Sequence, residues 1–305
     1  MIKKIALAII SLSLANIGFS VTNQEMIDAG NVYQKKIFDK YFNGAPLVAA
    51  DNTALMNKVY AEIMRNLYGE NRGYFDKEFA RLTGNRRSDF RSMYAYYSDY
   101  VVEYPKFLKK AFGNFLQDVG DMQSYTYTNT YLILETFNLN MNTYLEGEKN
   151  AETIDQNVNS VYDYLYSIGD SRTKDDYKKM SSGEMALLVD KEYQNLENIL
   201  DSRAAEGKIE KKAAAGSKSS LKRLKKLYSS YDRYFDKYID ASKLSAENKE
   251  KLKKLAKFEN ISNLKFIAQS IEKKDKDNDK IQKRNKDEKD LAMSTAALEY
   301  NQSKE

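Results

Sequence analysis

Two clusters of basic side chains are the residues of this sequence whose types and spacing could bind a ligand. One cluster holds six of the eleven arginines: Arg65, Arg72, Arg81, Arg86, Arg87 and Arg91. A guanidinium binds a carboxylate, sulfate or phosphate through two parallel hydrogen bonds, so residues 65–91 are a candidate anion site. Glu70, Asp76, Glu78 and Asp89 lie in the same stretch. Internal salt bridges are therefore the favoured interpretation of the cluster, and anion binding is the alternative.

The second cluster lies between residues 208 and 226. Its members are Lys208, Lys211, Lys212, Lys218, Lys222, Arg223, Lys225 and Lys226. Glu210 is the single acid in this stretch, which leaves a local charge excess of +7. Such an excess attracts anionic polymers or membrane surfaces in a salt-dependent way. A solvated lysine-rich turn is an equally good interpretation.

Three acidic residues near the C-terminus have the spacing that begins an EF-hand calcium loop: Asp275, Asp277 and Asp279. That loop needs Gly at its sixth position and a bidentate Glu at its twelfth, where this chain has Lys280 and Lys286. Because a lysine at the twelfth position repels the ion, we predict no metal site here. The sequence predicts no cofactor either.

Residue types that are missing exclude further chemistry. The sequence has no Cys, no His and no Trp, which removes disulfides, Cys/His zinc sites and every histidine-based catalytic relay. Paired carboxylates or a Ser–Lys pair would still permit hydrolysis. No spacing selects any such pair among the 44 acidic residues. A carboxylate-based hydrolase of the cell envelope is thus the least favoured function.

The N-terminus has the composition of a secretory signal peptide. Lys3 and Lys4 precede the apolar run 5–17, and Gly18-Phe19-Ser20 then offers small residues for cleavage before Val21. The run is shorter than the roughly 20 residues of a membrane span, so we expect cleavage after residue 20, export, and no stable membrane span in the mature chain. A retained N-terminal anchor is the alternative.

The sequence predicts that the elements which position these side chains are helices almost throughout. With only two prolines in 305 residues, the sequence argues against many-stranded β folds such as sandwiches and barrels. Apolar residues instead recur at helical spacing, as in the seams Ile154, Val158, Val161, Leu165, Ile168; Met185, Val189, Tyr193, Leu196, Leu200; and Leu224, Tyr228, Tyr231, Phe235, Tyr238. We predict an all-α fold, with a turn at Gly207 and 213–217 and with Pro105 in the first turn of a helix.

Composition divides the mature chain into three regions. Residues 21–180 are predicted to form a Tyr-rich helical bundle, in which the aromatic side chains form a core rather than a carbohydrate-binding face. Residues 181–271 are predicted to form a lysine-rich helical hairpin. Residues 272–305 form a charged tail, either a solvated helix or disordered, because 15 of the 19 residues in 272–290 are charged.

The hairpin region resembles the FadA family of exported bacterial adhesins. The resemblance rests on Gly183-Glu184 and on Glu192-Tyr193-Gln194-Asn195-Leu196 with Asn198. It implies an antiparallel helical hairpin that assembles end to end and attaches to host cells. It also implies that five apolar residues are hairpin and assembly contacts: Met185, Leu188, Leu196, Ile199 and Leu200.

We therefore expect an exported interaction protein, an adhesin or a self-assembling surface component that works through its helical faces. Its expected partners are a host or envelope surface, an anionic polymer, and further copies of the chain. Export makes nucleic acid an improbable partner. The alternatives are a soluble periplasmic scaffold that holds an anion at residues 65–91 and the hydrolase named above.

Overall fold

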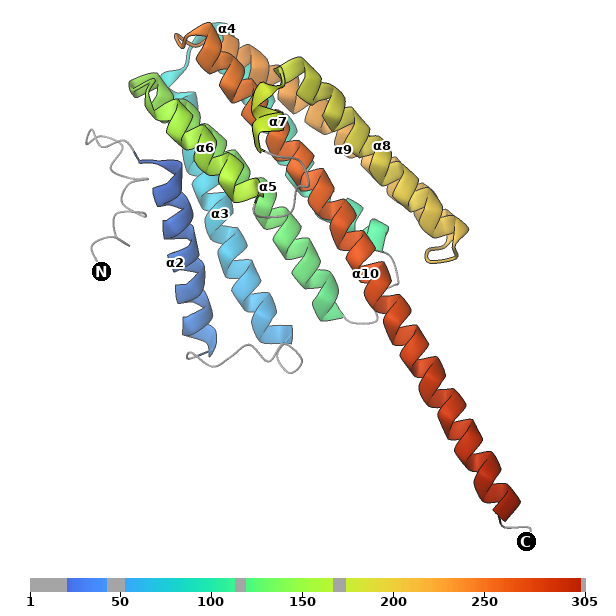
Figure 1. The fold of residues 1–305 in the computed structure, drawn as a ribbon. Helices are drawn as coiled ribbons and strands as arrows, with labels where there is room; N and C mark the ends of the chain where they lie inside the picture. The colour runs from blue at the N-terminus through green and yellow to red at the C-terminus, as the bar shows by residue number, and fades with distance from the viewer. Residues whose placement is uncertain (1–20, 43–52, 113–118, 167–173, 303–305) are drawn as a thin grey trace.

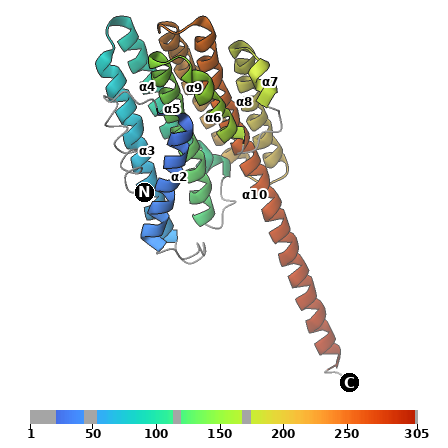
Figure 2. The ribbon, with the colours of Figure 1, turned by 60° about the vertical axis from the view of Figure 1, so that its left-hand side comes forward.

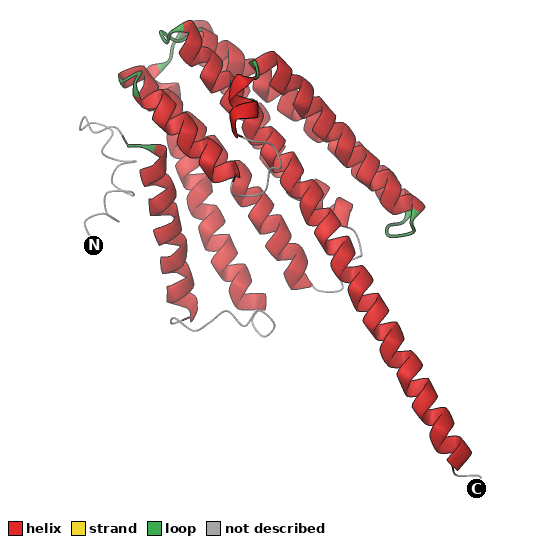
Figure 3. Cartoon of the chain, viewed as in Figure 1, coloured by secondary structure: helices red, strands yellow, loops and turns green. Residues whose placement is uncertain are grey.

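The computed structural model describes residues 21–42, 53–112, 119–166 and 174–302, and nearly all of them are helical (Figures 1 and 3). The helices are α2 (Asn23–Phe42), α3 (Thr53–Arg81), α4 (Gly84–Phe112), α5 (Val119–Lys149), α6 (Thr153–Tyr166), α7 (Lys174–Lys179), α8 (Ser182–Ala205), α9 (Lys211–Asp240) and α10 (Ala246–Gln302). These described ranges contain no strand, which confirms the predicted all-α class. The predicted signal peptide lies outside the described residues.

The helices form one bundle in which α5 is central. It packs against α3, α4, α6 and α10, while α2 covers α3 and α6 on one side (Figure 2). The most extensive packing joins α4 to α9, and α8 and α10 flank α9. A continuous hydrophobic core runs through both regions that composition separates at residue 180. The predicted two-helix hairpin is thus part of three helices that pack on the bundle.

The predicted apolar seams supply this core. All five seam residues of α8 and all five of α9 are buried. Opposite α9, buried rings of α4 pair in antiparallel register, with Phe90 against Tyr238 and Tyr97 against Tyr231 at ring centroid separations of 5.0 and 5.8 Å. The prediction that the aromatic side chains form a core is confirmed for these rings. Each such pair contributes about 0.5–1.5 kcal/mol beyond its buried area.

Two predicted helix boundaries are wrong. Residues 213–217 lie inside α9, because three consecutive alanines favour helix, and the turn is confined to residues 206–210, where Gly207 has φ +71°. Pro105 lies inside α4 rather than in a first turn. A proline costs an interior helix about 3 kcal/mol, and burial of Tyr104 and Phe107 beside it offsets this cost.

The predicted tail is a continuation of α10, which extends beyond the bundle in both views (Figures 1 and 2). Its first turns are not fully solvated. Asp275 is buried and lies 3.0 Å from the Arg203 guanidinium at the end of α8, and Lys208 contacts Asp279 at 3.4 Å. Among the described residues, no helix is both long enough and apolar enough to cross a bilayer.

Candidate functional site

The six predicted arginines lie on α3 and α4, and three of them bind carboxylates within the chain. Arg72 binds Asp76 one turn later on the exposed surface of α3, at 3.0 Å. Arg81 and Arg86 join a network at the α3–α4 end of the bundle. The remaining three are exposed: Arg65, Arg87 and Arg91. Half of the cluster therefore does form internal salt bridges, and Arg65, Arg87 and Arg91 remain available to a ligand.

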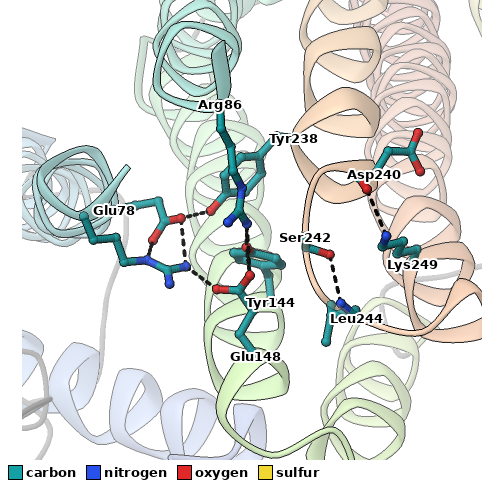
Figure 4. A network of polar contacts seen from close by, with 10 residues as sticks. Glu78, Arg86, Tyr144, Glu148, Tyr238, Asp240, Ser242, Leu244 and Lys249 are labelled. Atoms are coloured by element: carbon teal, nitrogen blue, oxygen red, sulfur yellow. Dashed lines mark hydrogen bonds and ion pairs between the residues drawn. The ribbon is translucent and has the colours of Figure 1, made fainter. Parts of the chain in front are cut away.

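The network begins at Glu78, a fully buried carboxylate of α3 (Figure 4). It accepts a hydrogen bond of 2.8 Å from Arg81 and another from the Tyr238 hydroxyl of α9. Because a buried carboxylate is costly unless it is paired, these two donors stabilise the place where α9 meets α3.

Glu148 of α5 completes the network (Figure 4). It accepts hydrogen bonds from Arg81, from Tyr144 and, at 2.9 Å, from Arg86. Burial raises the pKa of Glu148, but these three donors outweigh it and hold that pKa below its ordinary value. Arg81 and Arg86 thus tie α3, α4, α5 and α9 together.

The lysine cluster also divides, into members that pair with acids of α8 and of the α8–α9 turn and members on the exposed side of α9. On the side of α9 that faces α8, Lys218 binds Asp201 at 2.6 Å and Lys225 binds Asp190 at 2.7 Å. Lys208 binds Glu206 in the α8–α9 turn at 2.9 Å. The members on the outward side of α9 are exposed: Lys211, Lys212, Lys222, Arg223 and Lys226.

This outward side of α9 continues beyond the predicted cluster. Every residue of α9 from 211 to 237 is described, and its exposed members are Lys211, Lys212, Ala215, Ser219, Lys222, Arg223, Lys226, Ser229, Arg233 and Lys237. Seven are cations and three are small. The one exposed acid of α9 is Asp240, its last residue, which binds Lys253 of α10 at 2.5 Å. Arg233 and Lys237 were not predicted, although their spacing of seven and eleven residues from Lys226 places them on the same helical side.

The outward side of α4 has a similar composition. Its exposed cations are Arg87, Arg91, Lys106, Lys109 and Lys110, and Asp99 is its one exposed acid. The three lysines were not predicted as ligand contacts. No local pattern in the sequence places them beside α9, because that requires knowing that the two helices pack together.

The outward sides of the two helices adjoin each other. Lys106 of α4 and Arg223 of α9 both approach the carboxylate of Glu103, at 3.4 and 3.6 Å. Tyr96 of α4 stacks on Tyr234 of α9 with ring centroids 5.7 Å apart, and both rings are partly exposed. We call the twelve exposed cations of α4 and α9 the α4–α9 cationic face. The whole chain has a formal net charge of only +5, so the rest of it is net acidic.

The predicted assembly contacts lie on α8. Met185, Leu196 and Leu200 are buried inside the bundle, and Leu188 and Ile199 are half-buried. Leu187, whose side chain is 70% exposed, is the large apolar residue that α8 presents to solvent. Contacts between copies of the chain through α8 would therefore involve Leu187 and the rims of Leu188 and Ile199. Self-assembly remains a prediction.

The half-buried Glu70 of α3 and the buried Glu135 of α5 interact and are a candidate pair for acid–base chemistry. Burial raises the pKa of Glu70 to about 7, and burial together with the charge of Glu70 raises the pKa of Glu135 to about 7. Glycoside hydrolysis by two carboxyl groups needs one protonated and one ionised partner, so the two pKa values must be pushed apart. Both pKa values rise, so this pair does not show that separation, and the hydrolase stays a prediction from the sequence.

The described residues give no support for metal binding. No group of three or more Asp or Glu in the described part of the chain is arranged to hold a metal ion. Comparison of the chain with protein-family models, with curated proteins and with solved structures finds no match. The resemblance to FadA-type adhesins stays a prediction that rests on the sequence alone.

Proposed function

We propose that this chain is an exported cell-surface protein that makes adhesive contacts through its helical faces, with the α4–α9 cationic face as the main contact surface. The observation that carries the proposal is the segregation of charge. Twelve exposed cations lie on two adjoining helices with two exposed acids among them, Asp99 and Asp240, in a chain whose remainder is net acidic.

This segregation has a physical consequence for partners. Evenly mixed surface charges cancel beyond about one Debye length, roughly 8 Å at physiological salt. A single-sign face does not cancel, so it attracts and orients an anionic surface before contact. The signal-peptide composition of residues 1–20 and the resemblance to exported adhesins support an extracellular partner.

A soluble periplasmic anion-binding protein is the second candidate, because the same face would serve it. Protease accessibility on intact cells distinguishes the two. We expect externally added protease to degrade the full-length mature chain while periplasmic control proteins survive. Survival of the chain until the outer barrier is opened would contradict surface exposure and favour the periplasmic candidate.

A further inference from the structure

The α4–α9 cationic face is long, and its α9 side is narrow. From Lys211 to Lys237, α9 rises about 1.5 Å per residue, so its cations extend over about 40 Å. Between the cations lie only Ala215, Ser219 and Ser229 among the exposed residues. Such a row offers repeated charge contacts to an extended polymer, with small side chains that allow close approach.

A membrane surface fits this face less well than a polymer. Helices that lie in a membrane interface bury large apolar side chains among the lipids. The exposed residues of α9 include no large apolar side chain, and α4 contributes only Val102, which is 55% exposed. The apolar sides of both helices are buried in the bundle core.

The stacked pair of Tyr96 and Tyr234 adds an aromatic surface beside the cations. Arg233 and Lys237 lie over the Tyr234 ring at 5.1 and 5.2 Å from its centroid. An aromatic ring presents apolar area to a sugar ring, while the phenol hydroxyl and the neighbouring cations bind polar groups. Rings flanked by cations suit a polymer that is both a carbohydrate and an anion.

We propose that the α4–α9 cationic face binds an extended acidic polysaccharide. Its carboxylate or sulfate groups pair with Lys222, Lys226 and Arg233 along α9 and with the lysines of α4, and a sugar ring packs against the exposed part of the Tyr96–Tyr234 pair. The choice of polysaccharide over nucleic acid rests on the proposed function, since an exported protein meets glycans first.

The test uses the full chain and dextran sulfate as the probe, with uncharged dextran as its matched control. We expect dextran sulfate to bind and dextran not to bind. Affinity should fall steeply as salt rises, because each ion pair releases counterions. At equal charge concentration, duplex DNA and vesicles of phosphatidylglycerol with phosphatidylcholine should bind more weakly. Tighter binding to vesicles or to DNA would overturn the proposal.

Two triple variants assign the binding to this face. K222Q/K226Q/R233Q should weaken dextran sulfate binding about ten-fold or more and make its salt dependence shallower. K35Q/K36Q/K191Q removes the same charge from exposed lysines of α2 and α8, and its affinity should stay within about two-fold. Equal losses in the two variants would contradict a specific face.

A third variant tests for carbohydrate recognition. Y234L should weaken binding of dextran sulfate and leave binding of linear polyphosphate unchanged. If it alters neither, the face is a general polyanion surface and the polysaccharide proposal fails. The proposed function is tested separately by protease accessibility. If the chain is accessible to protease but does not bind dextran sulfate, only the proposed ligand is refuted. If the chain is protected from protease but binds dextran sulfate, only the proposed location is refuted.

Discussion

The inward and outward sides of α9 differ in how their charges are balanced. The inward side carries Asp232 and Asp236 beside its buried rings, and both acids bind the buried Lys257 of α10 at 2.8 and 3.1 Å. The outward side carries seven exposed cations and one exposed acid, Asp240 at the end of the helix. One helix thus carries acids paired with a buried lysine on its inward side and an excess of exposed cations on its outward side.

This difference teaches that the position of a charged residue, and not the composition of the helix, decides whether the charge contributes to folding. A buried charge must be paired, so a change on the inward side is costly. An exposed lysine contributes little to folding, so the outward side is free to serve a partner. Changes on the two sides should therefore have opposite effects on stability and on polyanion binding.

The largest effect is expected at Lys257. K257M removes the cation between two half-buried carboxylates and should lower the free energy of unfolding by about 3–5 kcal/mol in urea denaturation. K257M/D232N/D236N removes all three charges and should recover most of that loss. A loss below about 1 kcal/mol in K257M would show that the inward charges do not depend on pairing.

The next effect concerns Glu135, a buried carboxyl of α5 that the structure gives no cation partner among the described residues. Its pKa rises from 4.5 in the unfolded chain to about 7 in the fold. The stability that protonated Glu135 contributes is complete below pH 4.5 and is lost as pH rises towards 7, about 3 kcal/mol in all. Thermal unfolding should therefore show a less stable protein at pH 8 than at pH 5.

The variant E135Q checks this assignment, because a neutral amide replaces the protonated acid. It should make the decline between pH 5 and 8 smaller, and the part that remains belongs to Glu70 and Glu259, whose pKa values burial also raises. Below pH 4.5 stability should fall in both proteins, since Glu148 has a lowered pKa and loses its ion pairs when it is protonated. An unchanged decline in E135Q would assign the pH dependence to other groups.

A smaller effect distinguishes two helical glycines. A Cβ at Gly216 of α9 meets nothing within 4 Å, so G216A should raise the free energy of unfolding by about 0.5–1 kcal/mol. A Cβ at Gly147 of α5 would lie 2.5 Å from the buried Ile154 side chain, so G147A should be destabilising by about 1 kcal/mol or more. Calorimetric melting temperatures that move in the same direction would contradict this packing.

The smallest effect on folding is expected on the outward side. K222Q/K226Q/R233Q should change the free energy of unfolding by less than about 0.5 kcal/mol, because the three side chains are exposed. Urea denaturation of this triple variant and of K257M under the same conditions compares the two sides of α9 directly. A loss as large as that of K257M would mean that the outward cations have a structural role.

Local patterns in the sequence predicted more of the fold than of the candidate site. The seams of α8 and α9 follow from helical spacing alone, and all ten of their residues are buried. The pairing of Lys257 with Asp232 depends on α10 packing along α9, across 25 residues of sequence. No local pattern contains that information.

The same limit applies to the cationic face. The sequence predicted Arg87 and Arg91 in one cluster and Lys222 and Lys226 in another. Their meeting on adjoining helices depends on the antiparallel register of α4 and α9, which buried ring pairs such as Tyr97 and Tyr231 establish. Helical spacing alone would have predicted that Arg233 and Lys237 lie on the same side of the helix as Lys222 and Lys226.

The most direct test of the account is lysine labelling on intact cells with a membrane-impermeant amine reagent, read out by mass spectrometry with and without dextran sulfate. The account predicts labelling of Lys35, Lys191, Lys222 and Lys226, which are all exposed. Dextran sulfate should then protect Lys222 and Lys226 and leave Lys35 and Lys191 unchanged. Absence of labelling until the envelope is opened, or equal protection of all four lysines, would contradict the account.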